Sequence, residues 1–267
     1  MKKIFIMFCS LMLFGLFIFS GCAGSTDKNQ VKPSTAIDLD SASVGDYVAF
    51  GHYEQDNNLD NGKEDIEWKV LDKKNGHILL LSRYGLDCQK YNEEQPGVTW
   101  ETCTLRNWLN SYFLNEAFSE TEKSAIPTVT LSNPDNPNFG TEGGNDTQDQ
   151  VFLLSLQEMQ QYFDLSDTWT DYNGNNYDVA GSQYYISGSK DVITSPTDYA
   201  KALEVYVSAG LHDAQGFFAC FWWLRSPGEN SSYAAGVGTD GKVHAGGFVV
   251  VGAHDAVRPA LWVNLAS

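Results

Sequence analysis

Basic residues are scarce in this sequence. Its 267 residues include 17 Lys and Arg against 34 Asp and Glu, which gives a formal net charge of −17. Nucleic-acid binding depends on Lys and Arg that neutralise phosphates, and an acidic chain repels phosphate on average. The composition therefore argues against nucleic acid as a partner. Since 42% of the residues are hydrophobic and 13% are aromatic, it also excludes a wholly disordered chain.

Cysteine is also scarce. Of the five cysteines, Cys9 lies in the apolar N-terminal segment and Cys22 follows that segment. The remaining Cys88, Cys103 and Cys220 have no metal-site spacing. Cys88 and Cys103 flank one segment, so a disulfide between them is one alternative. Nothing in the spacing fixes a bridge, and we favour three separate thiols.

Common catalytic motifs are missing. The sequence contains no G-x-S-x-G nucleophile elbow, no H-E-x-x-H zinc motif and no glycine-rich phosphate loop, and its five histidines are scattered. We therefore expect a non-catalytic binding module for a glycan, peptide or protein ligand. The alternatives are a cell-envelope hydrolase that uses paired carboxylates and a purely structural envelope protein.

The N-terminal segment has the features of an export signal. Two lysines precede an apolar run, Ile4 to Phe19, that is short for a membrane span. The following Ser20-Gly21-Cys22 resembles the cleavage box of bacterial lipoproteins, in which the cysteine becomes the lipidated first residue. A plain secretory signal or an uncleaved anchor is the alternative. We expect residues 1–21 to be a lipoprotein signal peptide, 22–43 a lipid-anchored flexible tether and 44–267 a single domain.

These features predict an extracytoplasmic location, with the protein held on the bacterial cell membrane through a lipid on Cys22. An acidic protein does not bind anionic lipid through charge, so the acyl group has to provide the anchor. The expected partners are the membrane, through that lipid, and a cell-wall glycan or a surface protein.

The order of predicted elements is strands, then helices, then strands, which is typical of the α+β class. Asn75-Gly76 predicts a tight hairpin turn in the opening strands. Residues 105–113 carry an apolar stripe at helical spacing, expected to lie in the core, with Thr102 or Thr104 as N-cap. Capping boxes predict helices after Ser119 and Ser155. The predicted strands are 44–53, 66–71, 77–82, 151–154, 217–225, 233–238, 243–251 and 257–265.

Two long segments read as loops. Residues 132–150 are rich in Asn, Pro, Gly and Asp, and residues 164–196 are loop-like but unusually aromatic. Long aromatic loops are often functional, and Tyr and Trp provide large contact areas with few rotatable bonds. The alternative is that these rings cover a small core of the loop itself. The expected ligand-binding residues are Trp169, Tyr172, Tyr177, Tyr184 and Tyr185.

Four ordered segments carry a family resemblance: 100–110 (WETCTLRNWLN), 151–155 (VFLLS), 222–228 (WWLRSPG) and 257–264 (VRPALWVN). They resemble the signature segments of domain of unknown function 6273, a family common in exported proteins of Gram-positive bacteria. That family is similar to C-type lectin-like folds, including the formylglycine-generating enzymes. The resemblance implies one C-type lectin-like domain of mostly antiparallel strands, with two or three short helices and long ordered loops. Formylglycine-generating enzymes use a C-terminal cysteine pair, whereas Cys220 stands alone, so their activity is not expected.

The motif residues themselves have mainly structural interpretations. Strand alternation places Trp222 and Trp223 on opposite faces, so one is expected in the core and the other under a loop or in a binding groove. Arg225 and Arg258, each close to a proline at a strand end, are expected to be buried guanidinium groups that join carbonyls or carboxylates.

No cofactor is expected, with calcium as the alternative. Asp56, Asn58, Asp60, Gly62 and Glu67 copy the spacing of a calcium loop. The glycine required at position 6 is replaced by asparagine, and no helices flank the segment, so a hairpin loop is the favoured interpretation. A calcium site built from the loops 133–149 or 164–178 is a second alternative.

Overall fold

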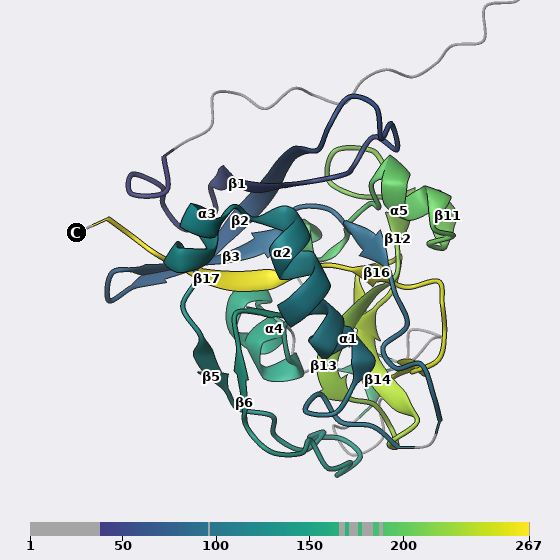
Figure 1. Cartoon of the computed structure of the whole chain (residues 1–267). Coiled ribbons are helices and arrows are strands. Elements are labelled where there is room, and N and C mark those ends of the chain that lie inside the picture. Colours follow the sequence, from purple (N-terminus) through teal and green to yellow (C-terminus); the bar gives the residue numbers. More distant parts are fainter. Residues whose placement is uncertain are drawn as a thin grey trace, which may run out of the picture. The chain divides into compact units, whose positions relative to one another are not determined.

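The computed structural model describes residues 38–95, 97–165, 169–170, 176–177, 184–186 and 189–266. Strand accounts for 35% and helix for 18% of the chain. The expected mixture of antiparallel strands with few helices is therefore confirmed (Figure 1). Residues 1–37, which include Cys22 and the expected signal peptide, lie outside the described residues, and so does Tyr172. Within the described ranges, no helix has the length and apolar character needed to cross a membrane.

The first sheet has five strands in the order β1-β2-β3-β17-β7, all antiparallel. The Asn75-Gly76 turn joins β2 and β3 with φ values of 53° and 76°, as the hairpin signal predicts, because such turns require positive φ at both positions. The last strand of the chain thus pairs with the opening hairpin. The strands are β1 (Tyr47–Tyr53), β2 (Glu64–Lys74), β3 (His77–Ser82), β7 (Val151–Phe152) and β17 (Ala260–Asn264).

The second sheet has six strands in the order β10-β15-β14-β13-β16-β4. Its pairs are antiparallel except for β13 with β16, which is parallel. The strands are β4 (Asp87–Cys88), β10 (Tyr184–Ile186), β13 (Trp222–Pro227), β14 (Tyr233–Val237), β15 (Lys242–Val249) and β16 (Ala256–Val257).

Three two-stranded ribbons and several short helices complete the described part of the chain. The ribbons are β5 (Val129–Leu131) with β6 (Thr147–Asp149), β8 (Trp169–Thr170) with β9 (Asn176–Tyr177), and β11 (Val207–His212) with β12 (Phe218–Cys220). The helices are α1 (Thr104–Trp108), the π-helix η1 (Leu109–Phe113), α2 (Leu114–Ala117), α3 (Glu120–Ala125), α4 (Leu156–Phe163), the 3-10 helix η2 (Lys190–Val192) and α5 (Asp198–Ala202).

Arg258 and Pro259 separate two strands that lie in different sheets. The sequence pattern predicts one strand over 257–265, whereas β16 belongs to the second sheet and β17 to the first. Arg258 is 2% exposed and donates to the carbonyls of Ser82 and Asp191 at 2.9 and 3.0 Å. Its guanidinium also lies 4.8 Å from the ring centroid of Trp222. The expected buried guanidinium is confirmed, and it holds the crossing between the sheets.

Both indoles of the Trp222-Trp223 pair are fully buried. The Trp222 indole donates to the carbonyl of Val192, and the Trp223 indole donates to the carbonyl of Gln89. Trp222 therefore packs against the 3-10 helix η2 and Trp223 against the loop segment at Gln89, so of the two alternatives for the second ring, cover by a loop is the one found. Burial of both rings is possible because each indole N–H finds a carbonyl partner.

The predicted aromatic helix exists but changes geometry along its length. Its N-cap is Cys103, whose sulfur accepts from the Arg106 amide at 3.3 Å, so the Thr102 or Thr104 cap is wrong. The helix continues as a π-helical turn from Leu109 to Phe113. Tyr112 is 53% exposed, so the stripe is only partly in the core. A π-helical turn adds one residue per turn, and the buried positions continue at Phe113, Leu114 and Ala117.

Both predicted capping boxes are present. The Ser119 and Ser155 hydroxyls accept from the amides of Glu122 and Glu158, and each glutamate accepts from the amide of its serine. Helices α3 and α4 therefore begin where the sequence predicts.

Asn136 pins the long loop after β5 to the second sheet. Its side chain is 1% exposed and its amide nitrogen lies 2.7, 3.2 and 2.9 Å from the carbonyl oxygens of Pro227, Gly228 and Ala245. Its carbonyl oxygen accepts from the amides of Asn138 and Phe139. The predicted irregular loop over 132–150 is confirmed up to residue 146, and β6 follows it.

The described chain begins at Asp38, ahead of the expected domain start at residue 44. Ala42 is 2% exposed in the core, and Lys73 donates to the carbonyls of Asp40 and Ala42 at 2.8 and 2.9 Å. The Asp40 carboxylate accepts from the Ala266 amide at 3.0 Å. Residues 38–42 therefore pack on the domain rather than standing apart from it.

Asn136→Asp keeps the shape of the side chain but points a carboxylate at three carbonyl oxygens. We expect it to lower the free energy of unfolding by about 3 kcal/mol or more, because the buried donors are lost and a charge is desolvated. Urea denaturation measures the change. The exposed Asn115→Asp is the control, with an expected loss below about 1 kcal/mol. Equal losses in the two variants would show that Asn136 does not hold the loop.

Candidate functional site

A groove lies where α4, β5 and the first sheet meet. Its cavity volume is about 270 Å³, close to the lower end of the range of about 300–1,000 Å³ typical of small-molecule sites. Figure 1 shows α4 and β5 below β17, and β13 and β14 of the second sheet to the right of α4. The lining residues come from five separate segments: Lys74, Leu79, Val129, Thr130, Leu131, Ser132, Ser155, Gln157, Glu158, Gln161, Tyr162, Arg225 and Trp262.

The first turn of α4 supplies one wall of the groove. Glu158 closes the capping box by accepting from the Ser155 amide at 2.8 Å. The same carboxylate forms an ion pair with Arg225, through both terminal guanidinium nitrogens. One glutamate therefore starts the helix and neutralises a buried cation, and its position is fixed by both bonds.

Arg225 closes the inner end of the groove and is 4% exposed. Besides Glu158, it donates to the carbonyls of Leu153 and Ser132 at 2.8 and 3.2 Å and to the Asn133 side chain at 3.2 Å. The expectation of a buried guanidinium that joins carbonyls and a carboxylate is confirmed. Because its donors are all directed at fixed groups, Arg225 holds the walls of the groove at set positions.

The Trp262 indole lines the groove from the first sheet. Lys74 places its ammonium nitrogen 5.0 Å from the ring centroid and pairs with Asp72 at 2.7 Å. Tyr162 donates to Asp72 from the α4 side at 3.4 Å. Burial, with the nearby Asp72 carboxylate, raises the pKa of Tyr162 above its ordinary value. The groove is therefore lined by the indole of Trp262 and the neutral phenol of Tyr162. The Lys74 ammonium beside the indole and the Asp72 carboxylate beside the phenol form an ion pair with each other.

Strand β5 and the following Ser132 form another wall, with the consecutive residues Val129 to Ser132. Pro127 follows α3 and prevents the helix from continuing, which leaves the chain extended. In its ribbon, β5 pairs with β6 alone. Its second edge is therefore free of a strand partner within the described residues.

None of the described residues that line the groove is a predicted contact residue. Trp169 pairs with Tyr177 across β8 and β9, and Tyr184 and Tyr185 pair with His244 and Val243 across β10 and β15. The backbone of these four residues is described, but their side chains and the whole of Tyr172 lie outside the described residues. Their part in ligand binding stays a prediction. Burial lowers the pKa of His244 to about 4, so this imidazole opposite Tyr184 is neutral at physiological pH.

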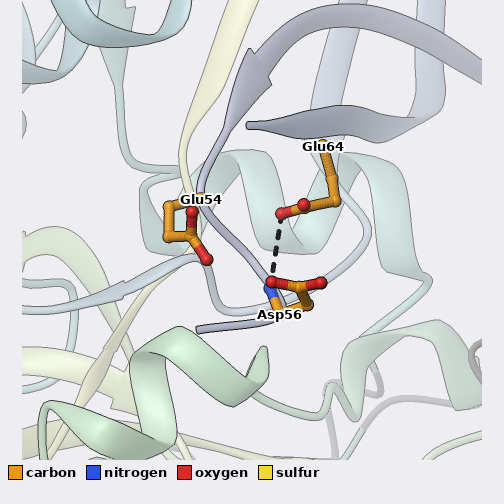
Figure 2. A group of neighbouring side chains, drawn as sticks. All are labelled: Glu54, Asp56 and Glu64. Carbon is orange, nitrogen blue, oxygen red and sulfur yellow. Dashed lines mark hydrogen bonds between the residues drawn. The ribbon is translucent and has the colours of Figure 1, made fainter. Parts of the chain in front are cut away.

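Three carboxylates meet in the loop between β1 and β2 (Figure 2). One oxygen from each of Glu54, Asp56 and Glu64 lies within 4.8 Å of the others. Glu64 accepts from the Gln55 and Asp56 amides at 2.7 and 3.3 Å, and Glu54 accepts from the Asn58 amide at 2.9 Å. Burial, with the charges of its two neighbours, raises the pKa of Glu54. These carboxylates brace the loop through backbone amides.

The structure selects different acids from those of the calcium-loop pattern. Asp56 is shared, but its neighbours are Glu54 and Glu64, while Glu67 forms an ion pair with Arg83 at 2.8 Å. In a helix–loop–helix calcium site, the glutamate at position 12 reaches back to the ion. Here Glu67 lies within strand β2 (residues 64–74), so it does not join the loop carboxylates. Among the described residues, no His, Cys, Asp or Glu of the 133–149 loop belongs to a group of three. Calcium binding stays the untested alternative to the expectation of no cofactor.

Asp255 is a buried carboxylate outside the groove. It is 8% exposed, and no hydrogen bond to its carboxylate is found among the described residues. Burial raises its pKa to about 7, against a small opposing effect of His254. This residue is therefore a stability liability at alkaline pH.

The three described cysteines do not line the groove. None of its lining residues, all within the described ranges, is a cysteine or a histidine. Cys88, Cys103 and Cys220 are free thiols, as favoured from their spacing. Burial raises the pKa of Cys88 and of Cys103 to about 12, so neither is a thiolate at neutral pH. The groove offers hydroxyl, amide, carboxylate and ammonium groups and one indole.

Sequence reasoning missed Trp262, Tyr162, Gln157 and Gln161 as site residues. Gln157 and Gln161 lie four residues apart on a predicted helix, which puts them on one face. That signal does not show that the face borders a cavity, because the opposite walls come from distant segments.

These features define the class of the protein as an α+β domain with a preformed polar groove and structural arginines in its strand motifs. The chain belongs to the family described as "Domain of unknown function (DUF6273)", whose model matches residues 75–265. The searches found no similar curated protein and no similar solved structure.

Arg225→Lys keeps the charge but not the fork of donors. We expect the free energy of unfolding to fall by about 2–3 kcal/mol, because an ammonium cannot serve Glu158 and three further acceptors at once. Denaturant unfolding with unchanged m measures the loss. Arg83→Lys, at a guanidinium with one acceptor among the described residues, Glu67, in place of four, is the matched control and is expected to lose less than Arg225→Lys. Equal losses would contradict the structural role of Arg225.

Asp255→Asn is expected to change how stability depends on pH. A carboxyl whose folded pKa is raised binds more protons in the folded state than in the unfolded state, so the wild-type protein loses stability as pH rises from about 4 to 7. The variant has no such loss, and we expect it to be more stable by up to about 4 kcal/mol at pH 8 and nearly equal at pH 4. Urea denaturation at both pH values checks this, with the exposed Asp60→Asn as control. An unchanged difference between the two pH values would contradict it.

Proposed function

We propose that this protein is a non-catalytic binding module of the bacterial cell envelope and that the groove between α4, β5 and Trp262 is its ligand site. The observation that carries the proposal is the preformed groove, which combines a cavity of about 270 Å³ with polar side chains and an indole. Small-molecule sites are typically concave, largely preformed and provided with a few convergent polar groups.

The support for binding rather than for a purely structural role comes from unused hydrogen-bonding groups. The side chains of Gln157, Gln161 and Ser132 line the groove, and no hydrogen bond from them to another described residue is found. Beside them, the Arg225 network is fully occupied and fixed. A rigid frame with free polar groups at its surface lowers the ordering cost of binding.

The proposal places the domain outside the cell, on a lipid attached to Cys22. The apolar run before Ser20-Gly21-Cys22 supports an export signal of the lipoprotein type. The antiparallel sheets, short helices and long pinned loop agree with a C-type lectin-like domain, which is the fold we propose. Such a domain presents its binding site to cell-wall glycans or to neighbouring surface proteins.

A paired-carboxylate hydrolase is the alternative, and the Glu54, Asp56 and Glu64 group is the feature on which it would rest (Figure 2). Glycoside hydrolases need one carboxyl as a proton donor and a second free to act on the sugar or on water. Here Glu54 and Glu64 accept from amides of their own loop. Bracing the loop accounts for these contacts, so binding is the better-supported function.

Ligand binding is expected to raise the melting temperature of the purified chain. A ligand selective for the folded state adds about 2.7 kcal/mol at a concentration of 100 times Kd, which is roughly 5–10 °C for a domain of this size. We expect at least one member of a panel of cell-wall glycan fragments and peptides to produce such a shift.

Ser132→Trp tests whether the groove is responsible. Ser132 is exposed and makes no side-chain hydrogen bond among the described residues, so a large ring fills the groove without removing a contact. The ligand-induced shift is expected to disappear in Ser132→Trp and to persist in Ser43→Trp, an exposed serine outside the groove. A flat response to the whole panel, or a shift that survives Ser132→Trp, would overturn the proposal.

A further inference from the structure

We infer that the groove takes a neutral saccharide, which stacks on Trp262 and forms hydrogen bonds with the amides of Gln157 and Gln161. The inference rests on the proposed function and names the ligand class for the same site. Charge, hydrogen-bonding capacity and the indole face each support it independently.

The charged groups of the groove compensate one another. Arg225 is paired with Glu158, and Lys74 is paired with Asp72 at 2.7 Å. An ionic ligand would enter without a free counter-charge and would pay a desolvation cost that nothing offsets. The groove therefore favours a ligand without net charge.

The hydrogen-bonding groups suit a ligand that both donates and accepts. Each glutamine amide offers two donors and an acceptor oxygen, and Ser132 adds a hydroxyl of either role. Gln157 and Gln161 are four residues apart on α4, so their side chains are neighbours on one face of the helix. A row of sugar hydroxyls has the matching alternation of donors and acceptors.

The indole face of Trp262 already holds a positively charged group. The Lys74 ammonium lies 5.0 Å from the ring centroid, and both Lys74 and Trp262 line the groove. The negative potential of an aromatic face attracts cations and, more weakly, polarised C–H groups such as those on one side of a pyranose ring. A sugar that displaces the ammonium leaves Lys74 with Asp72 as its partner.

The cavity volume of about 270 Å³ is of the size that a mono- or disaccharide occupies. A longer glycan would extend past the exposed Gln157 and Gln161 into solvent. The competing ligand is an extended peptide that pairs with the free edge of β5, a mode in which main-chain hydrogen bonds give the affinity. We favour the saccharide because β5 has only three residues and offers a peptide few such bonds.

Isothermal titration of the purified chain tests the inference. The probes are chitobiose, cellobiose and maltose as neutral disaccharides, and an alanine tetrapeptide with blocked termini. At least one disaccharide is expected to bind with a Kd that Trp262→Leu weakens tenfold or more. Trp262→Phe, which keeps an aromatic face, is expected to stay within about threefold, and Trp108→Phe, at a half-buried indole outside the groove, is the matched control.

A second variant guards against misfolding at Trp262. Gln157→Ala with Gln161→Ala changes exposed positions of α4 and favours the helix, so its fold is expected to be intact. We expect it to weaken disaccharide binding at least fivefold with an unchanged melting temperature of the free protein.

The outcomes separate the inference from the proposed function. Binding of the peptide and of no disaccharide, abolished by Ser132→Trp, would overturn the saccharide inference and leave the binding module standing. Disaccharide binding that is indifferent to both the Trp262 and the glutamine variants would also overturn it. Absence of binding by every probe, together with a flat thermal response to the wider panel, would overturn both.

Discussion

The buried guanidinium of Arg225 is the constraint on which the groove and much of the fold depend. Arg225 lies on β13. Its side chain donates to Ser132 and Asn133 at the start of the irregular loop and to Leu153, which follows β7. Its charge is compensated by Glu158, which in turn begins α4. A buried cation is costly unless its donors are all satisfied. Segments from three parts of the chain are therefore fixed together at one point.

Arg258 has the corresponding role between the two sheets. It lies where the chain passes from β16 to β17, and it stacks on Trp222 while binding carbonyls of two other segments. Burial lowers its pKa to about 10, yet it stays charged at physiological pH. The two motif arginines therefore act as positioning residues inside the fold. The groups left for a ligand are the polar side chains and the indole around the groove.

Much of the local structure could be predicted from the sequence because its causes are local. The Asn75-Gly76 turn and the capping boxes at Ser119 and Ser155 act within a few residues, and they are present. The four motifs identified the family through residues that pack at the core. Local patterns failed where the backbone changed type. The π-helical turn exposed Tyr112, and Arg258-Pro259 divided one predicted strand between two sheets.

By itself, the sequence determined the α+β composition, the starts of α3 and α4, the buried arginines and the acidic character of the chain. Hydrophobic pattern, capping chemistry and charge depend on residue type and short spacing, so they can be read along one chain. Only the tertiary structure decided where the groove lies. Trp262, Gln157 and Ser132 are far apart in the sequence and share a cavity because β17 pairs with β3 and Arg225 draws α4 to β5. Long-range packing creates a groove, and no single segment contains that information.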